Sequence, residues 1–352
     1  MGCNVKKILF VMDILQAGGG AQKVLKLAMQ TLVQNGYDIE LVALKKSQNE
    51  IDLNGFKVHY ILPNTNERLL NNSFVILDKL KELSSKVDYV AVFIDFITLY
   101  FATIAVKIAP NRPKLIAFVR SRLSLASKLF NNPELNMDLE LLSLKSANVV
   151  VANSIECLNE LKEFNVSNTH LLYNPIKTTN LNYKQNSKNY AIAIGRIDSS
   201  KDHYTMIKAF KKANIKGLKL LIFGSGQDKA VNELKELIDD ANIELMGYSA
   251  NVSEYIKEAK FFVQTSIFEG LSNAVLECYS YALPAVLSAL ASNKEIYKND
   301  AIYCKCGDID GFAGAIKTLN EELNSNSYKP FTPDLSAFSM KNFEKKLLEI
   351  FK

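Results

Sequence analysis

The stretch ILFVMDILQAGGGAQKVLKLAM, residues 8–29, decides the fold class. Residues 8–12 form a continuous apolar run, which is typical of a strand buried on both faces of a parallel sheet. Three glycines at 18–20 then open a helix whose apolar residues recur at helical spacing until Asn35-Gly36 ends it. Strand, glycine loop and helix in this order predict the first unit of an α/β fold.

The same alternation continues along the chain. Further strands are predicted at residues 39–44, 57–62, 89–94, 114–119, 149–152 and 170–173, with helices at 74–84, 96–108, 138–145 and 155–164 between them. Asn174-Pro175 breaks this pattern, and the polar segment 177–189 lacks periodicity. We place a domain boundary there.

A second series starts at residue 190. Its predicted strands are 190–194, 218–223, 243–246, 260–263, 285–287 and 301–304, with helices at 203–213, 229–239, 252–259, 272–281 and 310–322. We therefore predict two doubly wound, Rossmann-like α/β domains at 1–180 and 181–333. An amphipathic segment at 334–352 is expected to pack back across the domains.

Composition describes an ordinary globular chain of 352 residues, 48% hydrophobic and 22% charged. Its net charge of +5 comes from residues 1–185, which hold 21 basic and 16 acidic side chains. We predict no nucleic-acid partner, no membrane-spanning run and no signal-peptide core. Five irregularly spaced cysteines favour a reducing compartment, and three scattered histidines argue against a histidine-based metal site, so neither metal nor cofactor is predicted.

The stretch FEGLSNAVLE, residues 268–277, joins a loop to a helix and carries two acids eight positions apart. Gly270 relaxes the backbone where Ser272 or Asn273 can cap the helix, so its first N–H groups can face an anion. Glu269 and Glu277 suit sugar hydroxyls, which a carboxylate accepts in pairs. The alternative is that Glu269 is an acid favoured by the helix dipole and Glu277 a surface residue.

Three further loops follow predicted strands, where ligands of doubly wound folds bind. They contain Gly18-Gly19-Gly20, the segment from Gly195-Arg196 to Lys201, and Gly224-Ser225-Gly226. An arginine and a lysine that converge with helix N–H groups make a metal-free diphosphate clamp. The alternative is that Arg196 and Lys201 are solvated loop residues.

Glu269-Gly270-Leu271-Ser272 with Leu276-Glu277 resembles the E-x7-E signature of the retaining nucleotide-sugar glycosyltransferases of family 4, also called glycosyl transferases group 1. The other three loops fall in the order and approximate spacing of that family. The resemblance covers nearly all of the chain, most firmly residues 190–290. It implies the GT-B architecture, with two Rossmann-like domains facing across a cleft.

This resemblance also implies roles for the site residues. Arg196 and Lys201 would hold the diphosphate, Glu277 the ribose hydroxyls and Glu269 the transferred sugar, with Glu269, Arg196 and Lys201 as the catalytic set. The full donor-binding set is Gly18, Gly19, Arg196, Lys201, Gly224, Gly226, Tyr248, Glu269, Gly270, Leu271, Ser272, Asn273 and Glu277. Retaining transfer in this family is thought to run on one face of the donor, and the leaving phosphate takes the acceptor proton without a metal.

The chain departs from the family pattern at two positions. Gln22 stands where many members have glutamate, and Arg120 stands where the first domain often offers histidine. Arginine cannot act as a general base, but it can bind a hydroxyl or a phosphate. We predict Asp95, Arg120 and Arg122 as acceptor-binding residues.

The resulting hypothesis is a retaining hexosyl- or N-acetylhexosaminyltransferase that uses a UDP-sugar and extends a lipid-linked glycan in cell-surface or glycoprotein glycan biosynthesis. Residues 96–133 contain no acid and interleave basic with apolar side chains, which favours a cytoplasmic enzyme held peripherally on the inner membrane leaflet. One alternative is a non-catalytic sugar-nucleotide-binding subunit. Another is an NAD-dependent oxidoreductase, although Lys23 breaks the G-x-G-x-x-G pattern.

Overall fold

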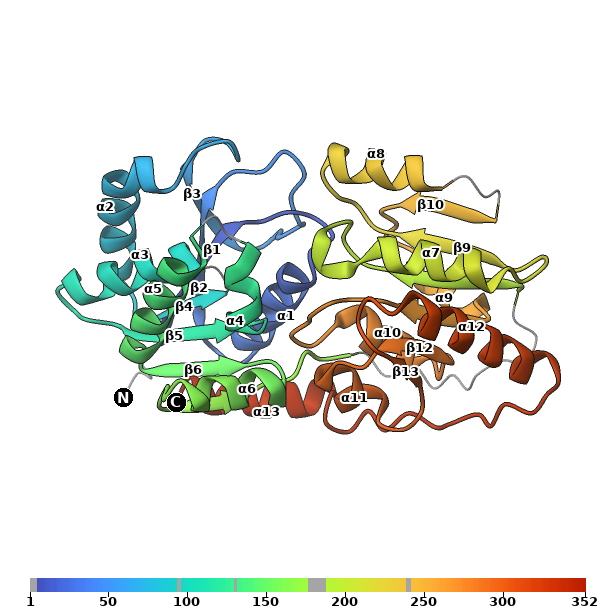
Figure 1. Cartoon of the computed structure of the whole chain (residues 1–352). Coiled ribbons are helices and arrows are strands. Elements are labelled where there is room, and N and C mark those ends of the chain that lie inside the picture. The colour runs from blue at the N-terminus through green and yellow to red at the C-terminus, as the bar shows by residue number, and fades with distance from the viewer. Residues whose placement is uncertain (1–4, 94–95, 130–131, 177–187, 239–241) are drawn as a thin grey trace. The chain divides into compact units, whose positions relative to one another are not determined.

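The computed structural model of the chain describes residues 5–93, 96–129, 132–176, 188–238 and 242–352. It divides into two compact units, each built on its own sheet (Figure 1). The first unit comprises Met1–Pro175 together with Met340–Lys352, and the second comprises Ile176–Ser339. Each unit is described by itself below.

The first unit contains a seven-stranded sheet in the order β3-β2-β1-β4-β5-β6-β7, and all of its pairings are parallel. Its strands are β1 (Lys7–Ile14), β2 (Asp38–Lys45), β3 (Lys57–Leu62), β4 (Tyr89–Phe93), β5 (Lys114–Val119), β6 (Val149–Ala152) and β7 (Thr169–Leu171). The strand order reverses between β1 and β4. This reversal is the topological switch point, where ligands of such sheets bind.

The helices of the first unit cover both faces of this sheet (Figure 1). They are α1 (Gly20–Gln34), α2 (Ser73–Ser84), α3 (Phe96–Ile108), α4 (Leu123–Ala126), α5 (Pro133–Ser146), α6 (Ile155–Glu163) and α13 (Met340–Ile350), with the 3-10 turns η1 (Leu70–Asn72) and η2 (Ser127–Leu129). Phe10 and its neighbours on one face form a core with α1 and α13. Alternate residues such as Val11 point to the opposite face and are equally buried, which explains the continuous apolar runs of the sequence.

The second unit repeats this construction with six parallel strands in the order β10-β9-β8-β11-β12-β13. The strands are β8 (Tyr190–Ile194), β9 (Lys219–Phe223), β10 (Ile243–Gly247), β11 (Phe261–Gln264), β12 (Ala285–Ser288) and β13 (Ile302–Cys304). The helices are α7 (His203–Ala213), α8 (Asp228–Leu237), α9 (Val252–Glu258), α10 (Asn273–Ser280), α11 (Ala291–Tyr297) and α12 (Ile309–Asn324), with the turn η3 (Ser199–Lys201). Here the switch point lies between β8 and β11.

Every predicted strand and helix has a counterpart in the structure, with ends shifted by a few residues. The short helices α4 and α11 were not predicted, because neither segment carries a full apolar period. The predicted boundary at 180/181 falls at residues 177–187, outside the described residues. Of the predicted third segment, residues 334–339 group with the second unit, and α13 packs into the core of the first.

The sequence suggested one exposed face for the basic and apolar run at residues 96–133. The structure does not place these side chains on one face. Leu99 and Phe101 in α3 are buried in the core. Lys114 begins β5 at the amino end of the sheet, whereas Arg120 follows the same strand at its carboxyl end. The mixed sequence therefore reflects buried apolar residues within α3 and β5, with cations near the ends of these elements and in the segments between them.

Candidate functional site

Two loops leave neighbouring strands at the switch point of the second sheet and are joined by hydrogen bonds. One follows β8 and the other follows β11. The Ile267 N–H donates to the carbonyl oxygen of Ser200 at 2.8 Å. The Thr265 hydroxyl lies within hydrogen-bond distance of the carbonyl oxygens of Lys201 (3.1 Å) and Asp202 (2.8 Å). The loops after β8 and β11 thus form one site at the carboxyl ends of these two strands.

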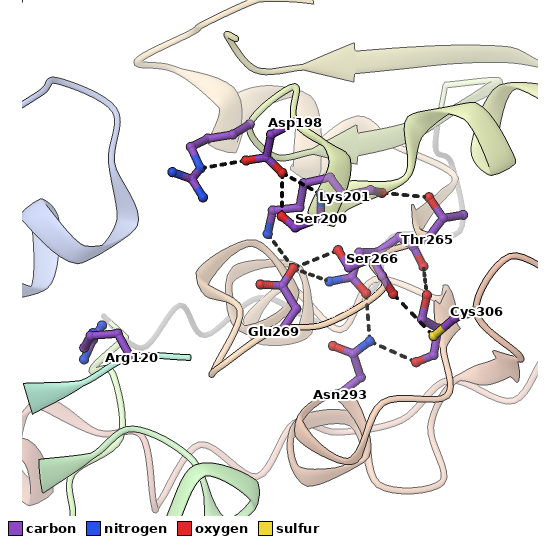
Figure 2. Close-up of polar contacts among 12 residues, drawn as sticks. Arg120, Asp198, Ser200, Lys201, Thr265, Ser266, Glu269, Asn293 and Cys306 are labelled. Atoms are coloured by element: carbon purple, nitrogen blue, oxygen red, sulfur yellow. Dashed lines mark hydrogen bonds and ion pairs between the residues drawn. The ribbon is translucent and has the colours of Figure 1, made fainter. Parts of the chain in front are cut away.

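The centre of this site is an ion pair between Lys201 and Glu269 (Figure 2). Lys201 Nζ lies 2.5 Å from Glu269 Oε1, and the two side chains are 19% and 11% exposed. The same oxygen accepts from Gln264 Nε2 at 3.0 Å and from the Ser266 hydroxyl at 2.8 Å. Three donors on Oε1 hold the carboxylate in one orientation, and no described residue donates to Oε2.

Arg196 is the exposed cation of the site. Its side chain is 73% exposed, and its Nε lies 3.2 Å from Asp198 Oδ2. Asp198 is fixed in turn, because its Oδ1 accepts from the Ser200 N–H at the start of η3. Arg196 therefore does not share the carboxylate of Glu269 with Lys201, and the structure brings together only one of the two predicted cations with the first acid.

The loops after β8 and β9 approach each other so closely that glycine is required. A Cβ on Gly224, which has φ of +158°, would lie 1.8 Å from the carbonyl oxygen of Gly195. A Cβ on Gly226 would lie 2.3 Å from the carbonyl oxygen of Ile197, whose N–H donates to Ser225. These glycines therefore shape the loop that carries Arg196.

The predicted anion-binding helix is α10. Ser272 occupies its N-cap position, but the side chain makes no capping hydrogen bond, so the expected cap is not formed. Gly270 and Leu271 lie buried just before it. Asn273 is the first helical residue, and Glu277 lies on the second turn, half-buried. Neither belongs to the group of donors around Glu269.

Two more residues border the loops of the second unit. Tyr248 follows β10 and is exposed, as suits a surface against which a base could stack. His203 begins α7 beside Lys201 and is buried. Burial lowers the pKa of His203 to about 4, with a smaller effect in the same direction from the Lys201 charge, so the ring is neutral at physiological pH.

In the first unit, the predicted glycine loop lies between β1 and α1. Gly18 has φ of +81°, and Gly19 is the N-cap residue of α1. Gln22 folds back over Gly19 and donates from Nε2 to the carbonyl oxygen of Ile14 at 3.2 Å. Gln22, which stands where many family members have glutamate, thus connects the glycine loop to the end of β1.

Arg120 follows β5 directly and packs its guanidinium over the Phe93 ring, 5.8 Å from the ring centroid. Burial lowers the pKa of Arg120 to about 10. Its Nε is buried and has no hydrogen-bond partner among the residues that the structure describes. Buried guanidinium groups are normally paired, so this one has an unused donor.

Other polar atoms on the same edge also lack partners within the described ranges of the chain. The buried atoms are Asp13 Oδ1, Thr98 Oγ1, Arg120 Nε and Asn153 Oδ1. Asp13 lies near the end of β1, and Arg120 and Asn153 directly follow β5 and β6. Thr98 lies in the first turn of α3, the helix that follows β4, and these four strands are neighbours in the sheet. A ligand with hydroxyl and anionic groups would satisfy this set of donors and acceptors.

The remaining predicted acceptor residues differ from Arg120. Asp95 lies outside the described residues. Arg122 pairs with Glu156 at 3.1 Å and with buried Glu160 at 3.3 Å, and Glu160 also accepts from the N–H of Leu123 where α4 begins. Arg122 is thus engaged in fixing a helix start.

The sequence analysis missed the residues that hold Glu269 in place. Gln264 ends β11, Ser266 lies in the following loop, and Asn293 lies on α11. A glutamine at the end of an otherwise apolar strand was a usable signal, whereas nothing marked Asn293.

In the part of the chain that the structure describes, no group of three His, Cys, Asp or Glu residues could hold a metal ion. Within the same residues, no helix has both the length and the apolar character needed to cross a bilayer.

Comparison with curated proteins gives partial matches. An N-acetylgalactosamine-N,N'-diacetylbacillosaminyl-diphospho-undecaprenol 4-alpha-N-acetylgalactosaminyltransferase of Campylobacter jejuni is 28% identical over 165 residues, 44% of this chain and 45% of that protein. A UDP-Gal:alpha-D-GlcNAc-diphosphoundecaprenol alpha-1,3-galactosyltransferase of Escherichia coli is 29% identical over 104 residues, 28% of this chain and 27% of the relative. The matched part of the chain thus spans less than half the length of each relative.

Solved structures match over the whole chain. HepE of Anabaena in complex with UDP and glucose has a TM-score of 0.76 at 14% identity, covering 98% of this chain and 99% of HepE. At this identity the likeness shows the fold alone, which is the two-domain Rossmann-like GT-B fold.

Family descriptions cover both units. Residues 18–180 match Glycosyltransferase Family 4, and residues 188–322 match Glycosyl transferases group 1. With the two parallel sheets described above, these matches identify the chain as a member of the family 4 (group 1) glycosyltransferases of GT-B architecture.

Proposed function

We propose that this chain transfers a sugar from a UDP-sugar to a lipid-linked glycan, with retention of configuration at the anomeric carbon. The observation that carries the proposal is the Lys201–Glu269 pair at the switch point of a sheet within the group 1 match. A half-buried carboxylate with one oxygen fully used and the other without a described donor suits the hydroxyls of a sugar.

The donor diphosphate is assigned to the cationic side of this site. Arg196 is exposed and can exchange its contact with Asp198 for phosphate oxygens, which guanidinium grips in pairs. Lys201 adds a second charge, and the start of α10, which has no side-chain cap, adds N–H donors. Glu277 is assigned to the ribose hydroxyls and Tyr248 to the base.

The reaction then needs positioning and charge stabilisation rather than a metal. The bond between the anomeric carbon and the diphosphate oxygen breaks, and a bond to the acceptor oxygen forms on the same face of the sugar. The acceptor proton passes to the leaving phosphate, so no general base is required of Arg120. Arg196 and Lys201 stabilise the negative charge that develops on the diphosphate.

The acceptor is assigned to the carboxyl edge of the first sheet. The unused Nε of Arg120 suits a phosphate oxygen, and Asp13 and Asn153 offer acceptors for hydroxyls. The names of the Campylobacter and Escherichia relatives include diphospho-undecaprenol-linked acceptors, which supports a lipid diphosphate here. Such an acceptor would bring the protein to the cytoplasmic face of a membrane.

A panel of UDP-, GDP- and ADP-sugars tested by thermal shift identifies the donor. We expect a UDP-sugar to raise the melting temperature more than UDP does, and a purified sample to transfer that sugar to a short-chain polyprenyl-diphosphate glycan with an α-configured product. Stabilisation without transfer or donor hydrolysis would instead support a non-catalytic binding subunit. If no sugar nucleotide stabilises the protein, the donor assignment is wrong.

A further inference from the structure

Two buried amides connect Glu269 to α11, the helix that follows β12 at the carboxyl edge of the second sheet (Figure 2). Asn293 on α11 is 0% exposed, and Gln264 at the end of β11 is 4% exposed. Asn293 Nδ2 donates to Gln264 Oε1 at 2.7 Å, and Gln264 Nε2 donates to Glu269 Oε1 at 3.0 Å. The three side chains therefore form a chain of hydrogen bonds that ends on the predicted sugar-binding carboxylate.

The direction of this chain is set at its far end. Asn293 Nδ2 also donates to the backbone carbonyl oxygen of Ser288 at 2.9 Å, and a carbonyl oxygen can only accept. The Asn293 amide must therefore present its nitrogen to Ser288 and to Gln264. Gln264 must therefore accept this hydrogen bond with its oxygen, and its nitrogen then faces Glu269. A backbone group thus fixes the orientation of two amides that could otherwise flip.

Reversal of this orientation would be costly at Glu269. A flipped Gln264 would place its carbonyl oxygen against Glu269 Oε1, and two acceptors at hydrogen-bond distance repel each other. Gln264 is 4% exposed and the Glu269 side chain 11% exposed, so little water is present at this contact to supply the missing donor. With all three donors on Oε1, the carboxylate instead keeps Oε2 directed away from its protein contacts.

We propose that Asn293 and Gln264 act as positioning residues, which lock the Glu269 carboxylate in the orientation that receives the hydroxyls of the donor sugar. This inference rests on the proposed function, because it takes the ligand of Glu269 to be that sugar. It extends the site to Gln264 and to α11, an element that carries none of the predicted residues.

Asn293→Ala and Asn293→Asp test the inference. The alanine variant frees Gln264 to flip, and the aspartate variant presents an acceptor that draws the Gln264 nitrogen away from Glu269. Asn320→Ala and Asn320→Asp are the matched controls. Asn320 is also a buried amide in the second unit, but it accepts from Lys260 at the amino end of β11, the end opposite to Gln264.

The quantity to measure is the ratio of the dissociation constants for UDP and for the UDP-sugar that stabilises the wild type best, by calorimetry on the full chain. UDP lacks the sugar, so its affinity should stay within about twofold. For both Asn293 variants we expect the ratio to fall about tenfold, the effect of one lost hydrogen bond to a charged group, with the aspartate variant more affected. The Asn320 variants should lose thermal stability and keep the ratio.

The possible outcomes separate the inference from the proposed function. If the Asn293 variants keep the wild-type ratio, or weaken UDP as much as the UDP-sugar, the positioning role is refuted while the proposed function stands. A wild type that binds no UDP-sugar more tightly than UDP overturns both. A fall in the ratio that the Asn320 variants share would also refute the inference, because it would reflect general loosening.

Discussion

The carboxyl edges of the two sheets share a topology but differ in how their polar groups are satisfied. In the second unit, Lys201, Gln264 and Ser266 all donate to Glu269, and Arg196 pairs with Asp198. On the edge of the first unit, four buried polar atoms, including Arg120 Nε, have no partner in the described part of the chain. At the second edge the predicted site residues Lys201, Glu269 and Arg196 already have partners, although Asn293 Oδ1 beside them has none in the described part of the chain, whereas at the first edge Arg120 Nε and three neighbouring atoms have none there.

This difference implies that the two proposed substrates bind to sites that differ in how far they are pre-organised. A carboxylate already oriented by three donors needs no rearrangement to accept sugar hydroxyls, as pre-organised sites do not. Buried groups without partners lower stability until something binds them. The second edge thus favours a rigid donor site, and the first favours a site completed by its acceptor.

The largest effect is expected from Glu269→Ala. It removes the carboxylate that we assign to the donor sugar, and we expect the transfer rate to fall at least ~100-fold, as when a pre-organised polar contact is lost. Glu254→Ala, which removes an exposed carboxylate paired with Lys257, should keep the wild-type rate. Initial rates at saturating donor provide the measurement. Near-normal turnover of the Glu269 variant would show that the donor sugar does not bind at this edge.

Paired methionine variants compare the two edges directly. Lys201→Met leaves Glu269 without its cation and should lower the free energy of unfolding by about 2 kcal/mol, less than for a fully buried pair. Arg120→Met removes a charge whose buried Nε has no partner among the described residues, and it should leave stability equal or higher. Both variants should lose transfer activity. Urea unfolding measures the difference, and equal destabilisation would contradict the contrast.

The acid stability of the second unit should depend on His203. The unfolded chain takes up a proton at the ordinary pKa near 6.5, but the folded unit takes it up only at about pH 4. Stability is therefore lost as the pH falls from 6.5 to 4, by up to about 3 kcal/mol. His203→Gln should flatten this part of the stability profile relative to wild type, as measured by urea unfolding at each pH. Parallel profiles would show that His203 is not the titrating group.

A smaller effect is expected from membrane binding near the first edge. Lys128 and Leu129 in η2 are exposed and follow Arg120 closely along the chain, whereas Arg112 and Lys114 lie at the amino end of β5. Loss of one lysine near an anionic surface should weaken binding about fivefold. Lys128→Ala should reduce co-sedimentation with anionic vesicles at low salt more than Lys114→Ala does. Equal behaviour of the two variants would argue against a membrane face at this edge.

The smallest effect is expected from a chelator. Because Arg196 and Lys201 are assigned the role of a bridging cation, the transfer rate should be unchanged in EDTA. Full loss of activity that magnesium or manganese restores would show that the two cations do not suffice.

The fold class and the order of the strands and helices could be predicted from the sequence alone, although many element ends were misplaced by a few residues. Continuous apolar runs such as residues 8–12 can be buried only between two layers of helices, which requires a parallel sheet. The residues at the carboxyl ends of those runs, among them Arg196 and Glu269, could then be grouped into one site, because parallel strands end on the same edge.

Tertiary structure alone decided the contacts within that site. Lys201 was predicted beside a diphosphate, but the fold also brings it against Glu269, a residue 68 positions away in the chain. Asn293 reaches Glu269 only through Gln264, across two elements whose sequences show no pattern that links them. Arg120 and Arg122 are near neighbours of one residue type, yet one has an unused donor and the other is ion-paired. Partners distant in sequence set these states, and local sequence cannot specify them.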